Sequence, residues 1–140
     1  LIKGIFEGDT INTPSMLAVE DYLDALAWAD SIGGLPALFA RADANAAALD
    51  AWVQATPWVA HLAADPACRS NTSVCLTLPG VAEERVKAMV SLLEKEGAAF
   101  DIGAYRDAPP GLRIWCGATV DTADVVTLTH WLDWAFAATG

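Results

Sequence analysis

Positive charge is scarce in this 140-residue chain, which has 8 lysines and arginines against 18 aspartates and glutamates and a formal net charge of −10. A chain with this balance repels a phosphate backbone, so general nucleic-acid binding is disfavoured. Because basic side chains are rare, each arginine becomes a stronger candidate for a specific anionic partner.

Long apolar runs are missing as well, although hydrophobic residues make up 54% of the sequence. Acidic residues and a proline interrupt the two most apolar stretches, 35–58 and 125–136. Neither stretch therefore supplies the ~20 uninterrupted residues that a membrane span needs. We expect no membrane helix and no membrane partner.

Cysteine is rare too: Cys68, Cys75 and Cys116 form an odd set without metal-ligand spacing, and no secretory leader is visible. We therefore expect reduced thiols, no bound metal and a cytoplasmic protein. Cys116 lies in an apolar stretch and is expected to be a buried, inert thiol rather than a nucleophile. The two histidines, His61 and His130, are expected to be structural.

The hydrophobic pattern predicts an α+β domain. Apolar residues with helical spacing indicate a helix over 16–32, with Thr13 as its N-cap, Pro14 in its first turn and Gly33-Gly34 at its end. Further helices are expected around 35–56, 86–96 and 128–140, and strands around 59–63, 72–78, 100–102 and 112–118, with a loop over 64–71. This order favours a short, mainly antiparallel sheet with helices packed on one face.

Two segments are candidates for a binding site. The first is the helix start at Asn12 and Thr13, where free N–H groups attract anions, although simple helix capping explains the same residues. The second is a proline-rich loop with Arg106 and Arg113 at its ends. Arginine suits carboxylate and phosphate oxygens, but either side chain could instead pair with acids such as Asp101 or Asp107.

Three stretches resemble bacterial phosphoserine aminotransferases: "IFEGDTINTPSMLAVEDYLDALAWADSIGGL", "DPACRSNTSVCL" and "AFDIGAYRDAPPGLRIWCGATV". The resemblance covers essentially the whole chain but only the C-terminal part of that family's sequence. It implies a fold-type-I enzyme that uses pyridoxal 5′-phosphate and moves an amino group between glutamate and 3-phosphohydroxypyruvate in serine biosynthesis. It also implies a homodimer, with residues 1–14 leading in from the large cofactor domain and 15–140 forming the small domain that closes over substrate.

The same resemblance assigns roles to five residues. Asn12 and Thr13 match a pair that reaches the cofactor phosphate of the partner subunit. Arg113 matches the arginine that holds the substrate α-carboxylate. Arg106 matches an arginine that helps to bind the substrate phosphate, and Tyr105 stands where other branches of the family have a histidine.

A cofactor lysine is not expected in this chain. Transamination needs a lysine that bonds covalently to the cofactor and moves the proton. Lys3, Lys87 and Lys95 are the only lysines, and none lies in the family's lysine context. The resemblance therefore implies that the chain acts only with its large domain and a second subunit. The alternative is a non-catalytic ligand-binding or protein-interaction domain that retains the aminotransferase C-terminal fold.

Overall fold

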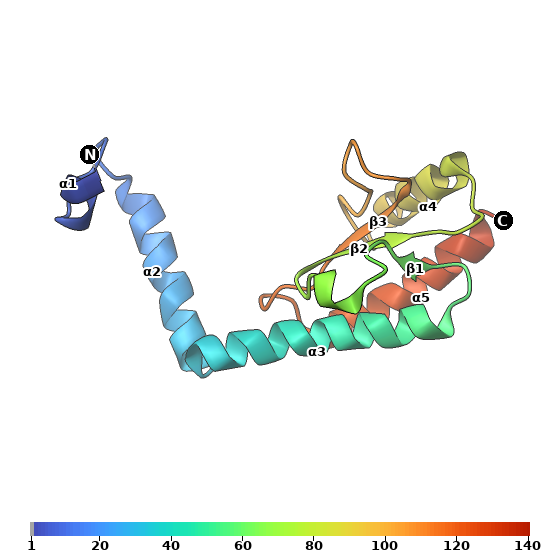
Figure 1. Cartoon of the computed structure of the whole chain (residues 1–140), viewed down its shortest axis with the longest axis horizontal. Helices are drawn as coiled ribbons and strands as arrows, with labels where there is room; N and C mark the ends of the chain where they lie inside the picture. The colour runs from blue at the N-terminus through green and yellow to red at the C-terminus, as the bar shows by residue number, and fades with distance from the viewer. Residues whose placement is uncertain (1) are drawn as a thin grey trace. The chain divides into compact units, whose positions relative to one another are not determined.

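The computed structural model describes residues 2–140, and the chain divides into two compact units, Leu1–Leu38 and Phe39–Gly140 (Figure 1). The first unit contains helices α1 (Ile2–Phe6) and α2 (Met16–Ser31) and the beginning of α3 (Gly34–Ala55). The second unit continues α3 and then contains β1 (Ala60–His61), a short 3-10 helix (Pro66–Cys68), β2 (Ser73–Thr77), α4 (Glu83–Lys95), β3 (Gly111–Trp115) and α5 (Thr122–Ala138).

Helix α2 ends as predicted but begins with a different cap. Ser15 is the N-cap, and its hydroxyl oxygen accepts a hydrogen bond from the backbone N–H of Ala18 at 3.4 Å. The prediction that Thr13 caps the helix is therefore wrong by two residues. Gly33 and Gly34 follow the helix with φ angles of 113° and 68°, a left-handed conformation that glycine adopts without steric cost.

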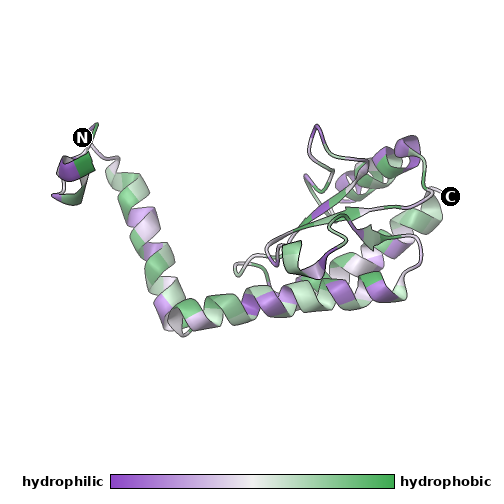
Figure 2. Cartoon of the chain, viewed as in Figure 1, coloured by the Kyte–Doolittle hydropathy of each residue, from purple (hydrophilic) through white to green (hydrophobic). Residues whose placement is uncertain are grey.

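Helix α2 has no buried residue. Its large apolar side chains are exposed along the helix and alternate with acidic ones (Figure 2). The exposed set comprises Met16, Leu17, Val19, Tyr22, Leu23, Leu26 and Trp28. A helix with this much exposed apolar surface is typical of a segment that packs against further protein.

The sheet of the second unit is antiparallel, with strand order β1-β2-β3. In β2 and β3, Val74 pairs with Ile114 and Leu76 with Leu112, and all four are buried. Residues between them, such as Cys75 and its partner Arg113, point to the opposite and more open face because side chains alternate along a strand. The predicted antiparallel α+β arrangement is confirmed.

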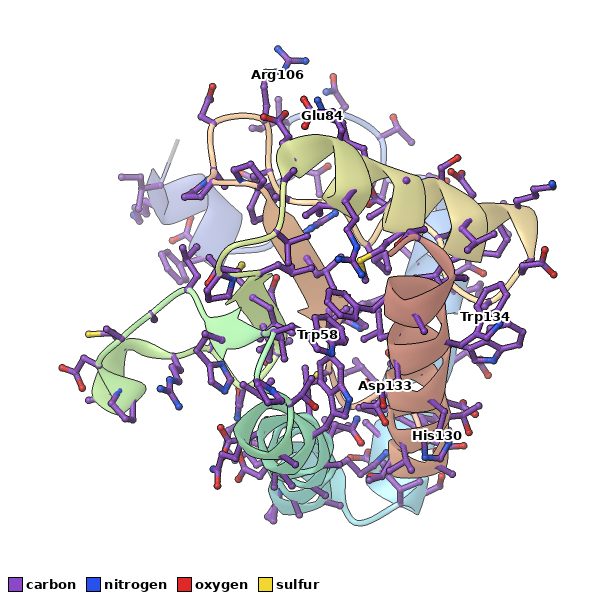
Figure 3. All side chains as sticks on the ribbon, turned by 90° about the vertical axis from the view of Figure 1, so that its right-hand side faces the viewer. Trp58, Glu84, Arg106, His130, Asp133 and Trp134 are labelled. Carbon is purple, nitrogen blue, oxygen red and sulfur yellow. The ribbon has the colours of Figure 1, made fainter. Side chains whose placement is uncertain are left out.

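The hydrophobic core lies between the buried face of the sheet and helices α3, α4 and α5. Each helix contributes apolar side chains to one cluster with the strands: Leu49 and Val53; Val86, Met89 and Leu93; and Val125, Leu132 and Ala135. Trp58 points inward (Figure 3) and stacks on Phe136, with ring centroids 4.1 Å apart and an interplanar angle of 4°. The helical spacing that predicted these helices therefore marks the faces that pack on the sheet.

A buried asparagine joins α3 to the connection between β3 and α5. Asn45 is 0% exposed, and its side-chain amide donates to the carbonyl oxygens of Cys116, Gly117 and Val120 at 3.2, 3.2 and 2.9 Å. Its side-chain oxygen accepts a hydrogen bond from the Thr122 hydroxyl at 2.6 Å. This single side chain satisfies backbone carbonyls that have no partner in a helix or a strand.

The strand predicted over 100–102 is not formed. Asp101 has a φ angle of 52°, which breaks the extended conformation in the middle of that segment. The chain makes only an isolated bridge between Gly103 and Leu112, and the Ile102 carbonyl accepts from the N–H of Arg113 at 2.8 Å. The loop predicted around 64–71 is present but contains the 3-10 turn Pro66–Cys68, which Asp65 caps through the N–H of Ala67.

Two kinds of feature are absent from residues 2–140. No helix there is long and apolar enough to cross a membrane. The same residues contain no group of three or more histidine, cysteine or acidic side chains arranged to hold a metal ion.

Candidate functional site

Arg113 lies on the open face of the sheet, in the middle of β3. Its side chain is 26% exposed and borders a hollow of about 280 Å³, which is also lined by Ser73, Phe100, Asp101, Ile102 and Trp115. Strand β3 fixes the backbone of Arg113, because its register with β2 pairs it with Cys75. The rigid sheet thus presents a guanidinium beside two exposed aromatic rings, an arrangement suited to a small anionic ligand.

Two neighbours hold the guanidinium of Arg113. Its Nη2 donates to a carboxylate oxygen of Asp101 at 2.7 Å and to the Asp101 carbonyl oxygen at 3.2 Å. The ring of Tyr105 lies against the guanidinium carbon, 4.6 Å from ring centroid to carbon. The pairing of Arg113 with Asp101 was one of the two alternatives that the sequence left open, and the structure forms it.

The same contacts change the proton affinities of the site. Hydrogen bonds from Ser73 and then from Arg113 lower the pKa of Tyr105, and the Arg113 charge acts in the same direction. The pKa of Arg113 is raised by its hydrogen bonds to Tyr105 and then to Asp101. Arg113 is therefore fully charged at neutral pH, as a group that binds an anion must be.

Arg106 lies apart from the Arg113 hollow. A second hollow, of about 430 Å³, runs between α4 and the loop 103–111, and both Tyr105 and Arg106 line it. The side chain of Arg106 is exposed and points away from the protein near the start of α4 (Figure 3). The structure thus brings Tyr105 into contact with Arg113, whereas the side chain of the next residue, Arg106, points away from both (Figure 3).

Asn12 and Thr13 lie in the first unit, in the exposed segment between α1 and α2. Ser15 makes the capping contact, so capping does not explain these two residues. Their amide and hydroxyl groups are accessible to a ligand, but no contact shows what they bind.

The structure supports a structural role for His61 and an inert role for one thiol. His61 Nε2 lies 2.8 Å from a carboxylate oxygen of Asp50, which also pairs with Arg69 at 3.5 Å. Cys116 is fully buried, and burial raises the pKa of its thiol to about 11. His130 is exposed on the outer side of α5 beside Trp134 (Figure 3).

Comparison with known proteins finds relatives that match nearly the whole chain. No protein-family model matches the chain. Over 136 residues, however, it is 51% identical to phosphoserine aminotransferase of Methanosarcina mazei and 52% identical to that of Methanosarcina barkeri. The chain is related to the phosphoserine aminotransferases. The match covers 97% of this chain and 36% of each of those relatives, so the chain spans about a third of their length.

A more distant relative and a solved structure are also similar to this chain. The chain is 28% identical over 130 residues to the enzyme of a Nocardioides species, a match that covers 91% of this chain and 34% of that relative. The solved phosphoserine aminotransferase of Bacillus circulans subsp. alkalophilus superposes with a TM-score of 0.81 at 22% identity, covering 92% of this chain and 35% of that chain. The resemblance predicted from the sequence motifs and the α+β fold are both confirmed.

The described part of the chain does not provide the covalent anchor of an aminotransferase cofactor. Lys87 pairs with Glu83 at 2.6 Å, and that contact raises the lysine pKa, which disfavours the uncharged nucleophilic amine. Lys3 is an exposed partner of Glu7, and Lys95 is exposed at the end of α4. The residues present therefore do not fit pyridoxal phosphate as a resident group, apart from the accessible side chains of Asn12 and Thr13.

Sequence reasoning did not single out Ser73 as a residue of the site. Ser73 lines the Arg113 hollow, and its hydrogen bond is the main cause of the lowered pKa of Tyr105. The signal was present in the alternation of β2, which places Ser73 and Cys75 on the same face. Only the register between β2 and β3 shows that this face is shared with Arg113.

Proposed function

We propose that the chain is the small C-terminal domain of a cytoplasmic phosphoserine aminotransferase, with residues 1–14 leading in from the large domain and 15–140 forming the small one. The complete enzyme transfers an amino group between glutamate and 3-phosphohydroxypyruvate to give phosphoserine in serine biosynthesis. Pyridoxal 5′-phosphate and the lysine that carries it belong to the large domain, outside this chain. The observation that carries the proposal is a charged arginine on a rigid strand in a chain more than 50% identical to these enzymes.

In this proposal the chain contributes substrate binding rather than chemistry. Arg113 receives the α-carboxylate of glutamate or of the keto acid, since its guanidinium borders an open hollow of suitable size for a small acid. Arg106 and Tyr105 bind the phosphate end of the substrate from the loop. Asn12 and Thr13 reach the cofactor phosphate of the other subunit in a homodimer.

The test is substitution of Arg113 in the complete enzyme. Charge-assisted hydrogen bonds are worth about 1.5–3 kcal/mol each, so Arg113→Ala is expected to lower kcat/KM for glutamate by ~10²–10³-fold. Arg69→Ala removes a charge and an ion pair with Asp50 but lies outside the hollow, and it serves as the matched control. An unchanged kcat/KM in the Arg113 variant would remove this residue from the substrate site.

The role of Arg106 is tested separately. Arg106→Ala is expected to reduce kcat/KM for phosphoserine more than for an analogue without the phosphate, because only the phosphate contact is lost. Equal losses for the two substrates would assign Arg106 to the structure of the loop.

The alternative, a non-catalytic interaction domain with this fold, is favoured by one observation, the exposed apolar side chains of α2. The same exposure is expected of a domain separated from its large domain. Supplying the large domain distinguishes the two proposals, because an aminotransferase then becomes active and an interaction domain does not. The 140-residue chain alone is expected to develop no visible absorption band with pyridoxal phosphate in either case.

A further inference from the structure

We propose that Asp101 is an internal competitor for the anion site of Arg113: its carboxylate occupies the guanidinium until the carboxylate of a ligand displaces it. The inference rests on the proposed function for the identity of that ligand. It adds a residue, Asp101, whose side chain sets the affinity of the site for that carboxylate.

The hydrogen-bonding capacity of Arg113 leads to this conclusion. A guanidinium has five N–H donors, one on Nε and two on each terminal nitrogen. The two acceptors of Asp101, its carboxylate and its carbonyl oxygen, both lie on Nη2 and together match its two donors. Either two-pronged mode of binding a carboxylate, through Nε and Nη2 or through Nη1 and Nη2, requires Nη2. A ligand can therefore bind in this mode only if Asp101 releases a donor.

The carboxylate of Asp101 is the acceptor that can leave. Its side chain is 90% exposed, whereas the carbonyl belongs to the backbone next to Ile102, which the sheet holds through the N–H of Arg113. Ion pairs with so exposed a partner contribute little to stability. Water can replace the protein contact of Asp101 once its side chain rotates outward.

The remaining contacts of Arg113 keep it ready for a ligand. Its Nε is buried and has no hydrogen-bond acceptor among the described residues, so one donor of the guanidinium lacks a partner. Tyr105 also hydrogen-bonds the guanidinium, and its ring lies against it, so Tyr105 restrains the guanidinium plane when Asp101 leaves. A ligand carboxylate that takes the place of the Asp101 carboxylate would restore the bond to Nη2.

The experiment uses the complete pyridoxal-phosphate-loaded enzyme that contains this chain and measures glutarate binding by titration calorimetry. Glutarate has the two carboxylates of glutamate but no amino group, so it binds without turnover. Asp101→Asn removes the charge, and asparagine tolerates the left-handed backbone at this position. Asp101→Gly removes the whole side chain and adopts the same φ freely. Asp107→Asn, an equal charge change in the neighbouring exposed loop, is the matched control.

Both Asp101 variants are expected to bind glutarate about two- to fivefold more tightly, the range expected for loss of one exposed competing ion pair. Their KM for glutamate should fall by a similar factor while kcat changes little, and Asp107→Asn should change neither. Unchanged or weaker binding in both Asp101 variants would overturn the inference, because Asp101 would then orient Arg113 rather than compete for it. Unchanged glutarate binding in Arg113→Ala would instead overturn the proposed function, so the two failures are distinguishable.

Discussion

The buried amide of Asn45 gives the most direct test of how this fold is held together. In Asn45→Ala, the carbonyl groups of Cys116, Gly117 and Val120 and the hydroxyl of Thr122 all lose their contact with this side chain. A buried polar group without a partner costs about 1–3 kcal/mol. The Gly117 carbonyl still accepts from the N–H of Val120 at 3.0 Å and the Val120 carbonyl from Arg41 Nη2 at 3.4 Å. The Cys116 carbonyl and the Thr122 hydroxyl are therefore the groups that lose their partner, and we expect a loss of about 2–4 kcal/mol in the free energy of unfolding.

The loss is large enough to measure by two methods. For a domain of this size it corresponds to a fall of about 6–15 °C in Tm by scanning calorimetry. Urea unfolding should show a lower midpoint with an unchanged slope, because the surface exposed on unfolding is nearly the same. Asn71→Ala is the matched control, since Asn71 is exposed and bonds only to Asp43 and to a neighbouring hydroxyl; it should cost less than ~1 kcal/mol.

A charged residue at the same position gives a second, pH-dependent test of the Asn45 contacts. Asn45→Asp keeps the shape and the acceptor for Thr122 but places a carboxylate against three carbonyl oxygens. Burial and these acceptors raise the pKa of the new carboxyl, so its charged form destabilises the fold above the unfolded pKa of about 4. The free energy of unfolding of this variant should therefore fall as the pH rises from about 4 toward the higher pKa of the folded state.

If Asn45→Ala loses less than about 1 kcal/mol, the reasoning from unsatisfied polar groups is refuted.

Two further predictions concern close packing and thiol ionisation. Gly111→Ala would place a Cβ well inside van der Waals contact with the carbonyl oxygen of Leu76, so we expect a loss of about 3 kcal/mol or more in urea unfolding. Gly103→Ala, with no atom within 4 Å of the new Cβ, should cost about 1 kcal/mol or less. Because burial raises the pKa of Cys116 to about 11, a disulfide reagent at pH 8 should modify exposed Cys68 rapidly and Cys116 only as fast as the protein unfolds. Between about pH 9 and 11 the thiol ionises in the unfolded chain before it ionises in the fold, so stability should decline over that interval; rapid modification of Cys116 at pH 8 would contradict its burial.

The elements that the sequence predicts best are those with strong periodicity. Apolar residues at helical spacing predicted α2, α3, α4 and α5, and alternation predicted β2, because each pattern follows from burying one face. The cap of α2 was misplaced because Thr13 and Ser15 are both good caps, and the choice between them depends on the backbone path before the helix. The residue types around the helix start do not determine that backbone path.

The candidate site was predictable in part. Arg113 and its possible partner Asp101 could be named from residue type, since arginines are few and acids lie nearby in sequence. The left-handed backbone of Asp101 was not predictable, because Phe100–Ile102 has the composition of a strand and only one residue interrupts it. Asn45 also escaped notice, since an asparagine in an alanine-rich helix resembles a surface residue until the connection 116–122 is folded over it.

The distribution of the core has a practical consequence for dividing this protein. Every buried member of the hydrophobic cluster lies between Leu49 and Ala135, and the described residues before Gly34 contribute nothing to it. A gene fragment that starts at Gly34 would thus encode α3 entire and a self-sufficient core. Such a fragment would lack α2, so its solubility should exceed that of the longer chain, which leaves the apolar side chains of that helix in water.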